Sequence, residues 1–178
     1  MGLLMVLALA LATQESAPPR NVRTVDSKIL ALIDAGISGS ATFRGLIATL
    51  NESDVIVYIV PKARVKSTYA AVSRHMLGGY FAHHIVSRGQ FRYVRIAVDI
   101  AGAEHRLVAV LAHELQHAVE VAQTPDARDA QSLERLFSRL AVAFGCGVTN
   151  CFETRAARDV EYIVRDELAE TRRRGQVR

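Results

Sequence analysis

The sequence has no internal repeat, no low-complexity tract and, after its first twelve residues, no hydrophobic run long enough to cross a membrane. These absences exclude a repeat array and a multi-pass membrane protein. Only two cysteines occur, so at most one disulfide can form within the chain. What remains is a chain of 178 residues that is 50% hydrophobic, which is long enough for one compact domain and too short for two ordinary ones.

Lysine is scarce as well, because three lysines stand against nineteen arginines, and the net charge of +4 is spread along the chain apart from the arginines at its C-terminal end. No aromatic residues interleave with these terminal arginines to stack on bases. We therefore expect a solvated tail and no nucleic-acid partner. A basic module that binds anionic polymers of the cell envelope is a further hypothesis, and it rests on the arginine excess alone.

The first twelve residues, MGLLMVLALALA, have the length of a signal-peptide apolar region, and small residues that fit an A-x-A cleavage site lie at their end. This pattern predicts a signal peptide at 1–12, a polar linker at 13–26 and one domain at 27–178. We expect an exported protein, periplasmic or secreted, with no stable membrane span once the signal is removed. In such a compartment Cys146 and Cys151 are suited to form a local disulfide, and two free thiols are the alternative.

The periodicity of the domain predicts helices, then strands, then helices. Residues 27–50 read as two helices or one broken helix, 55–60 as a buried strand, and 80–86 with 91–98 as a hairpin. The remaining predicted elements are helices at 103–123, 127–144 and 152–170. This order indicates an α+β domain with a small sheet.

The stretch LAHELQHAVEVA contains the pattern HExxH in the middle of the helix predicted at 103–123. Residues four apart lie one turn above each other on a helix, so His113 and His117 can bind the same ion. Glu114 projects about 100° round the helix, where it can act as a base on a water held by zinc. A chance pair of solvent-facing histidines is the alternative, but the opposite stripe of this helix is already apolar enough to bury it.

A catalytic zinc needs a third protein ligand. We favour Glu153, because it falls in line with the apolar stripe of the last predicted helix and a buried carboxylate is costly unless a cation neutralises it. An exposed carboxylate at the start of that helix is its alternative role. Glu120, Glu134 and the two cysteines are the competing ligands.

A helix with His113, Glu114 and His117, followed by a helix that carries Glu153, resembles the gluzincin group of metallopeptidases. The wider chain, with TFRGLIATLNESDVIVYI, LAHELQHAVEVA and FETRAARDV, resembles exported bacterial proteins with the same HExxH core. The resemblance implies a zincin-like fold with Zn²⁺ as cofactor. Gluzincins often place an Asp shortly after the ligand Glu, whereas Asp159 lies six positions on and fits that spacing poorly.

The resemblance also implies a side chain that steadies the developing oxyanion. The candidates for this role are His83, His84, Tyr93, Arg158 and Tyr162. The strand at 91–98 is expected to serve as the edge on which an extended substrate pairs.

The sequence thus predicts a zinc-dependent hydrolase that cleaves peptide bonds in a peptide or protein substrate, with Glu114 as general base and His113, His117 and Glu153 as metal ligands. A non-catalytic zinc-binding or interaction domain of the cell envelope is the alternative.

Overall fold

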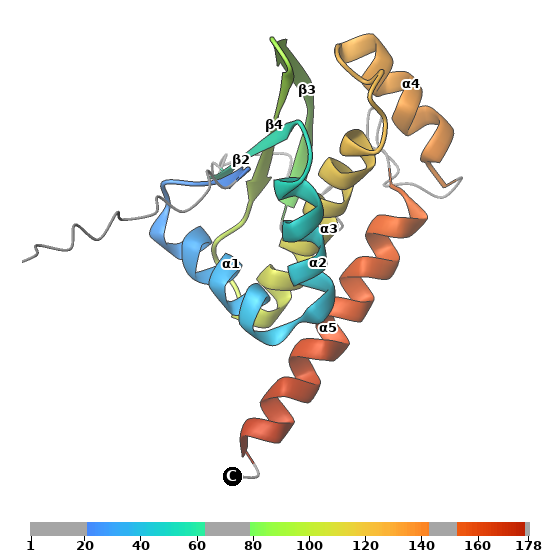
Figure 1. Cartoon of the computed structure of the whole chain (residues 1–178). Helices are drawn as coiled ribbons and strands as arrows, with labels where there is room; N and C mark the ends of the chain where they lie inside the picture. Colours follow the sequence, from blue (N-terminus) through green and yellow to red (C-terminus); the bar gives the residue numbers. More distant parts are fainter. Residues whose placement is uncertain (1–20, 63–78, 143–152, 177–178) are drawn as a thin grey trace, which may run out of the picture.

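A computed structural model describes residues 21–62, 79–142 and 153–176. The segments predicted as a signal peptide and as a disulfide loop, with Cys146 and Cys151, lie outside the described residues, as does most of the predicted linker. The described chain folds into five helices and a four-stranded mixed sheet (Figure 1). It is therefore an α+β fold, as predicted.

The two opening helices are α1 (Ser27–Gly39) and α2 (Ala41–Asn51), and the chain breaks between them at Ser40, which has an extended backbone. The Ser40 hydroxyl accepts a hydrogen bond from the Phe43 backbone N–H and so caps α2. Gly36 allows the close approach of the two helices, because a Cβ at this position would lie 2.7 Å from the ring of Phe43. The prediction of a broken helical segment is confirmed.

The sheet has the strand order β1-β2-β4-β3. Strands β1 (Val22–Arg23), β2 (Val55–Pro61) and β4 (Phe91–Val98) are parallel, and β3 (Gly79–Arg88) is antiparallel to β4. The hairpin of β3 and β4 is confirmed, with Gly89 at φ 59° in its turn. Two findings differ from the sequence analysis. Residues 22–23 belong to the sheet although they fall in the predicted linker, and β4 is a central strand, so β3 provides the edge.

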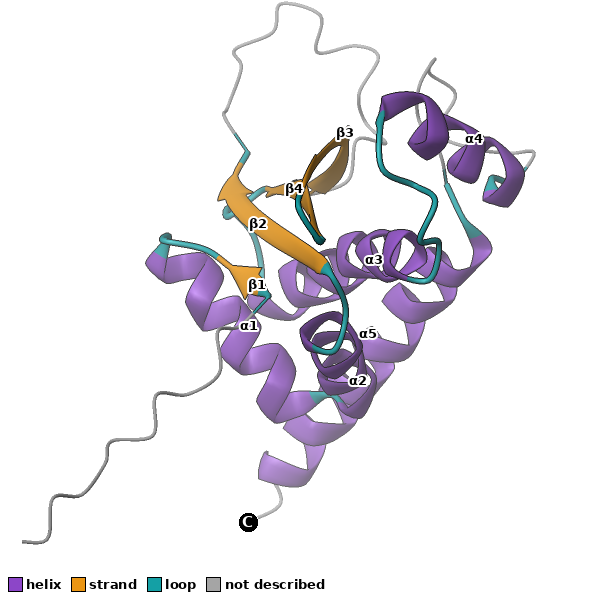
Figure 2. Ribbon diagram, turned by 45° about the horizontal axis from the view of Figure 1, so that its top comes forward, coloured by secondary structure: helices purple, strands orange, loops and turns teal. Residues whose placement is uncertain are grey.

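Helix α3 (Glu104–Ala122) lies at the centre of the molecule, between the sheet and α5 (Arg155–Gln176). In Figure 2, α1, α2, α3 and α5 all lie on one side of the sheet. Valine and isoleucine side chains from alternate positions of β2 and β4 pack on α3 around the fully buried Leu111 and Leu115. Buried apolar area of this kind provides most of the favourable free energy of folding.

Helix α4 (Ala130–Leu140) starts later than predicted because Asp129 forms a capping box with Ser132. Helix α5 also starts later than predicted, at Arg155, and it continues to Gln176, six residues past its predicted end. The terminal arginines 172–174 are therefore helical.

An arginine side chain lies inside the fold. Arg92 on β4 is only 1% exposed, and its guanidinium binds both carboxylate oxygens of Asp54 at 2.6 and 2.8 Å. The same group donates to the backbone carbonyls at the C-terminal end of α3 and in the turn that follows it, including those of Val121 and Thr124 at 2.8 and 2.7 Å. The Arg92 hydrogen bond holds the pKa of Asp54 below its usual range. Arg92 therefore links β2, β4 and the end of α3.

No single helix in the described ranges has the length and apolar composition needed to cross a membrane. Helices α1 and α2 meet that criterion only when taken together, and they are bent by 115° relative to each other.

Candidate metal centre

The HExxH residues lie in the buried part of α3. His117 and Glu114 are 4% and 6% exposed, and the rings of His113 and His117 lie 5.1 Å apart, centre to centre. The four-residue spacing thus gives two neighbouring imidazoles on one side of the helix. Phe81 from β3 and Phe137 from α4 pack edge-on against the His117 ring. The site is therefore enclosed by elements that are distant in sequence.

Two carboxylates contact His113, one on each ring nitrogen. Its Nδ1 lies 3.1 Å from Glu161 Oε2, and its Nε2 lies 3.6 Å from Glu153 Oε1. Arg165, one turn further along α5, donates to the other oxygen of Glu161. A His113 ring that donates its Nδ1 proton to Glu161 presents the lone pair of Nε2 towards Glu153.

His117 has a similar carboxylate partner. Its Nδ1 lies 2.9 Å from Oε2 of Glu120, which is itself 6% exposed. The hydroxyl of Thr154 donates to the other oxygen of Glu120 at 2.6 Å, and it accepts from the Ala157 backbone N–H in the first turn of α5. Glu120 therefore connects a histidine of α3 to the start of α5. Sequence analysis weighed Glu120 only as a competing ligand.

Glu153 lies beside His113, but for a different reason from the one that the sequence suggested. It precedes α5 and is not on the helix. The apolar stripe expected there included Ala156 and Ile163, and both of these residues are exposed. Its carbonyl accepts from the Val142 backbone N–H at 2.9 Å, which fixes the segment in an extended form. Its Oε1 is buried and has no hydrogen-bond partner among the described residues. A buried carboxylate oxygen in this state is costly unless a cation is bound.

The competing ligands are placed less favourably. Glu134 is exposed on α4, and Glu120 already binds His117 and Thr154. Asp159 is exposed on α5, and Glu161, two residues further on, is the carboxylate that binds His113. The sequence analysis missed Glu161.

The carboxylate of Glu114 is close to the start of β3. A Cβ on Gly79 would lie 3.2 Å from Glu114 Oε1, and the Phe81 backbone N–H donates a hydrogen bond to this carboxylate. Burial raises the pKa of Glu114 above its usual value, and the nearby His117 and His113 oppose that rise. A raised pKa makes this carboxylate a stronger base than an ordinary glutamate.

The contact between His113 and Glu161 favours a protonated His113 and an ionised Glu161. Burial alone would lower the pKa of His113, but the hydrogen bond to Glu161 and the charges of Glu114 and Glu153 raise it overall. The same hydrogen bond lowers the pKa of Glu161 despite its burial.

The candidates for oxyanion stabilisation are not brought together at this site. Arg158 and Tyr162 are exposed on α5, and His84 is exposed on β3. Tyr93 points away from α3, on the opposite face of the sheet from the buried Val94. The side chain of His83 is outside the described part of the structure.

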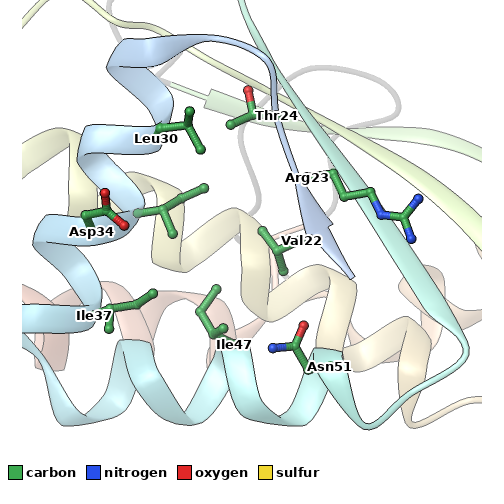
Figure 3. Close-up of a pocket in the computed structure, with 9 residues that line it drawn as sticks. Val22, Arg23, Thr24, Leu30, Asp34, Ile37, Ile47 and Asn51 are labelled. Atoms are coloured by element: carbon green, nitrogen blue, oxygen red, sulfur yellow. The ribbon is translucent and has the colours of Figure 1, made fainter. Parts of the chain in front are cut away.

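A pocket of about 530 Å³ lies elsewhere, between β1, α1 and α2 (Figure 3). It is lined by Val22, Arg23, Thr24, Leu30, Ile33, Asp34, Ile37, Ile47 and Asn51. It shares no residue with the histidine cluster, so it is a separate feature of the surface.

Among the described residues, no group of three or more His, Cys, Asp or Glu side chains is arranged so that it could hold a metal ion. The types of donor present are nevertheless those that zinc uses, because two imidazoles have carboxylate partners and Glu153 Oε1, without a hydrogen bond in the described chain, lies beside one of them.

No protein-family model, curated protein or solved structure matches this chain. The functional assignment therefore depends on the residues and their geometry.

Proposed function

We propose that this protein is a zinc-dependent hydrolase of the zincin type that cleaves peptide bonds, with His113, His117 and Glu153 as metal ligands. The observation that carries the proposal is the buried Oε1 of Glu153, which accepts no hydrogen bond from the described residues and lies 3.6 Å from Nε2 of His113. On both histidines the other nitrogen, Nδ1, has a carboxylate partner, Glu161 for His113 and Glu120 for His117. Metal-binding histidines in proteins usually have such a partner.

Two imidazoles and one carboxylate form a ligand set of catalytic zinc sites, which leave a position open for water or substrate. Zinc bound there would polarise a carbonyl oxygen and make water more acidic. The carboxylates of Glu120 and Glu161 orient the rings through Nδ1, and metal binding would displace the proton from Nε2 of His113.

Glu114 is the residue that moves the proton in this proposal. Its carboxylate, next to the two histidines and buried, accepts a proton from the attacking water and delivers it to the leaving amine. The Phe81 N–H fixes its orientation, and Gly79 leaves room for it under the start of β3.

The substrate proposed for this site is an extended peptide. Strand β3 is the edge of the described sheet, and its first residue is in near contact with Glu114. An extended peptide that pairs with a strand edge gains backbone hydrogen bonds there. In the sequence analysis this role was given to the strand at 91–98, which is central in the sheet. The apolar run at 1–12 leads us to propose an exported enzyme.

Metal analysis tests the proposal directly. We expect close to one zinc per chain in the purified protein, measured by mass spectrometry after dialysis, and loss of that zinc in His113→Ala and Glu153→Ala. Glu134→Ala is the matched control, because Glu134 is an exposed glutamate on α4. A wild-type protein that holds no zinc after reconstitution would contradict the assignment.

A second experiment concerns Glu120. We expect Glu120→Leu to weaken zinc binding by about 10- to 100-fold, because it removes the partner of His117 Nδ1 and the link to Thr154. Glu120→Gln should restore part of the affinity, since its single amide oxygen can still accept from one of the two groups. Affinity is measured by competition with a chromophoric chelator, beside thermal unfolding of the metal-free protein. Equal zinc affinity in wild type and Glu120→Leu would show that the link has no role at the site.

A further inference from the structure

The sheet has a second face, on the opposite side from α3, that combines aromatic and basic side chains. Side chains alternate between the two faces along a strand. In β2, Val55, Val57 and Ile59 point to the helices, so Tyr58 points the other way, and it is 42% exposed. In the described part of the sheet, with the irregular positions 82–84 left aside, the larger aliphatic residues at such outward positions are Ile56, Val60 and Val86. The aromatic and basic residues there are Arg23, Tyr58, Tyr80, Arg88, Phe91, Tyr93 and Arg95, together with Lys62 directly after β2. We call these residues the outer face.

Register brings rings and cations of the outer face into contact. Tyr58 on β2 is paired with Arg23 on one side and with Arg95 on the other. The rings of Tyr58 and Tyr93 are stacked at 6.5 Å with an angle of 18° between them. The guanidinium of Arg23 lies 6.0 Å from the Tyr58 ring centre. Similarly, the Lys62 amine lies 5.9 Å from the ring of Tyr80, which is 40% exposed.

Within the described strands the outer face has three cations, Arg23, Arg88 and Arg95, and no carboxylate. Lys62 and Asp99 lie one residue beyond the ends of β2 and β4. An ordinary solvated sheet face pairs opposite charges across its strands. The charge also disfavours a second copy of this chain as the partner, because two outer faces would repel each other. A polyanion is complementary to it.

We propose that the outer face binds single-stranded nucleic acid. Exposed rings on a sheet stack on unpaired bases, while nearby arginine and lysine neutralise the phosphates. Three of the five tyrosines of the chain lie on this one face, and a polyanion without bases makes no use of them. We expected no nucleic-acid partner from the sequence because the terminal arginines have no aromatic residues between them. On the outer face, by contrast, aromatic and basic residues are neighbours.

The test uses the purified protein and a fluorescein-labelled oligothymidylate of twelve nucleotides, followed by fluorescence anisotropy. We expect Tyr58→Ala and Tyr93→Ala each to weaken binding by about tenfold or more through loss of stacking. Arg95→Gln should lower the slope of log affinity against log salt by about 0.7, which corresponds to one phosphate contact on a single strand. Tyr58→Phe, which keeps the ring, should bind like wild type.

Matched controls separate the outer face from charge and tyrosine content in general. Tyr162 and Arg173 are an exposed tyrosine and an exposed arginine on α5, on the other side of the sheet. Tyr162→Ala and Arg173→Gln should leave binding unchanged, and circular dichroism checks the fold of every variant. Polyphosphate that binds as tightly as the oligonucleotide, with no effect of the tyrosine variants, would overturn the proposal in favour of a simple polyanion surface. No binding at low salt would overturn it altogether.

This proposal does not depend on the metal. Binding should be the same in Glu114→Gln and in protein stripped with a chelator, because the outer face is separated from α3 by the sheet (Figure 2). Failure of one proposal therefore leaves the other intact.

Discussion

Glu114→Gln is expected to lower the rate of peptide hydrolysis by about 10²- to 10⁴-fold, the range typical of a lost general base. Glutamine is nearly isosteric with glutamate and can still accept a hydrogen bond from the Phe81 N–H, so the local structure should persist. It cannot take up a proton from water. The measurement is the initial rate on labelled casein and on a mixed peptide library, with zinc content determined on the same samples.

The zinc content decides what a negative result means. Zinc near one per chain with hydrolysis lost only in Glu114→Gln supports Glu114 as the base. Zinc bound equally by both proteins with no hydrolysis by either would favour a non-catalytic zinc domain, in which the metal contributes to folding. Gln116→Glu is a suitable control for charge, because Gln116 lies on the same helix between the two histidines. If Glu114→Gln retains full hydrolytic activity, the proposed mechanism is wrong.

Arg92→Met is expected to reduce the free energy of unfolding by about 3 kcal/mol or more, because removing one partner of a buried ion pair leaves other polar groups without their donors. The groups affected are Asp54 and the carbonyls at the end of α3. The effect should be visible as a lower urea midpoint with an unchanged slope. Because the pKa of Asp54 is depressed in the folded state, the pair contributes above the ordinary pKa of Asp54 and is lost as the pH falls through its lowered value.

The control for this experiment is Arg95→Met. Arg95 lies on the same strand but points to the outer face and is exposed, so its replacement should change the stability by less than about 0.5 kcal/mol. A similar decrease in the free energy of unfolding in both variants would show that the contacts of Arg92 are not the cause.

The elements with a strong hydrophobic period were predictable. The break at Ser40, strand β2, the hairpin and α3 all follow from local pattern and turn chemistry. Strand β1 was missed because two residues in a polar stretch carry no period, and they become a strand only by pairing with β2. The central position of β4 was missed as well, since the order of strands in a sheet depends on long-range pairing.

The candidate site was predictable to the extent that it is local. His113, Glu114 and His117 follow from spacing on one helix, and Glu120 could have been recognised as the partner of His117 from its i+3 position. Arg92 shares the inward alternation of Val94, which was a signal for its burial. Glu161 gave no such signal, because its contact with His113 depends on how α5 packs against α3. Glu153 was selected from a helical stripe to which it does not belong.

The position of Glu153 ahead of α5 has a consequence for folding. A metal held by His113 and Glu153 would join two points about forty residues apart in the sequence. Such a link works like a removable crosslink, because it lowers the entropy of the unfolded chain by closing a long loop. The packing of α5 on α3 would then depend on the free metal concentration. The metal would stabilise the contact between these two parts of the chain in addition to its role in catalysis.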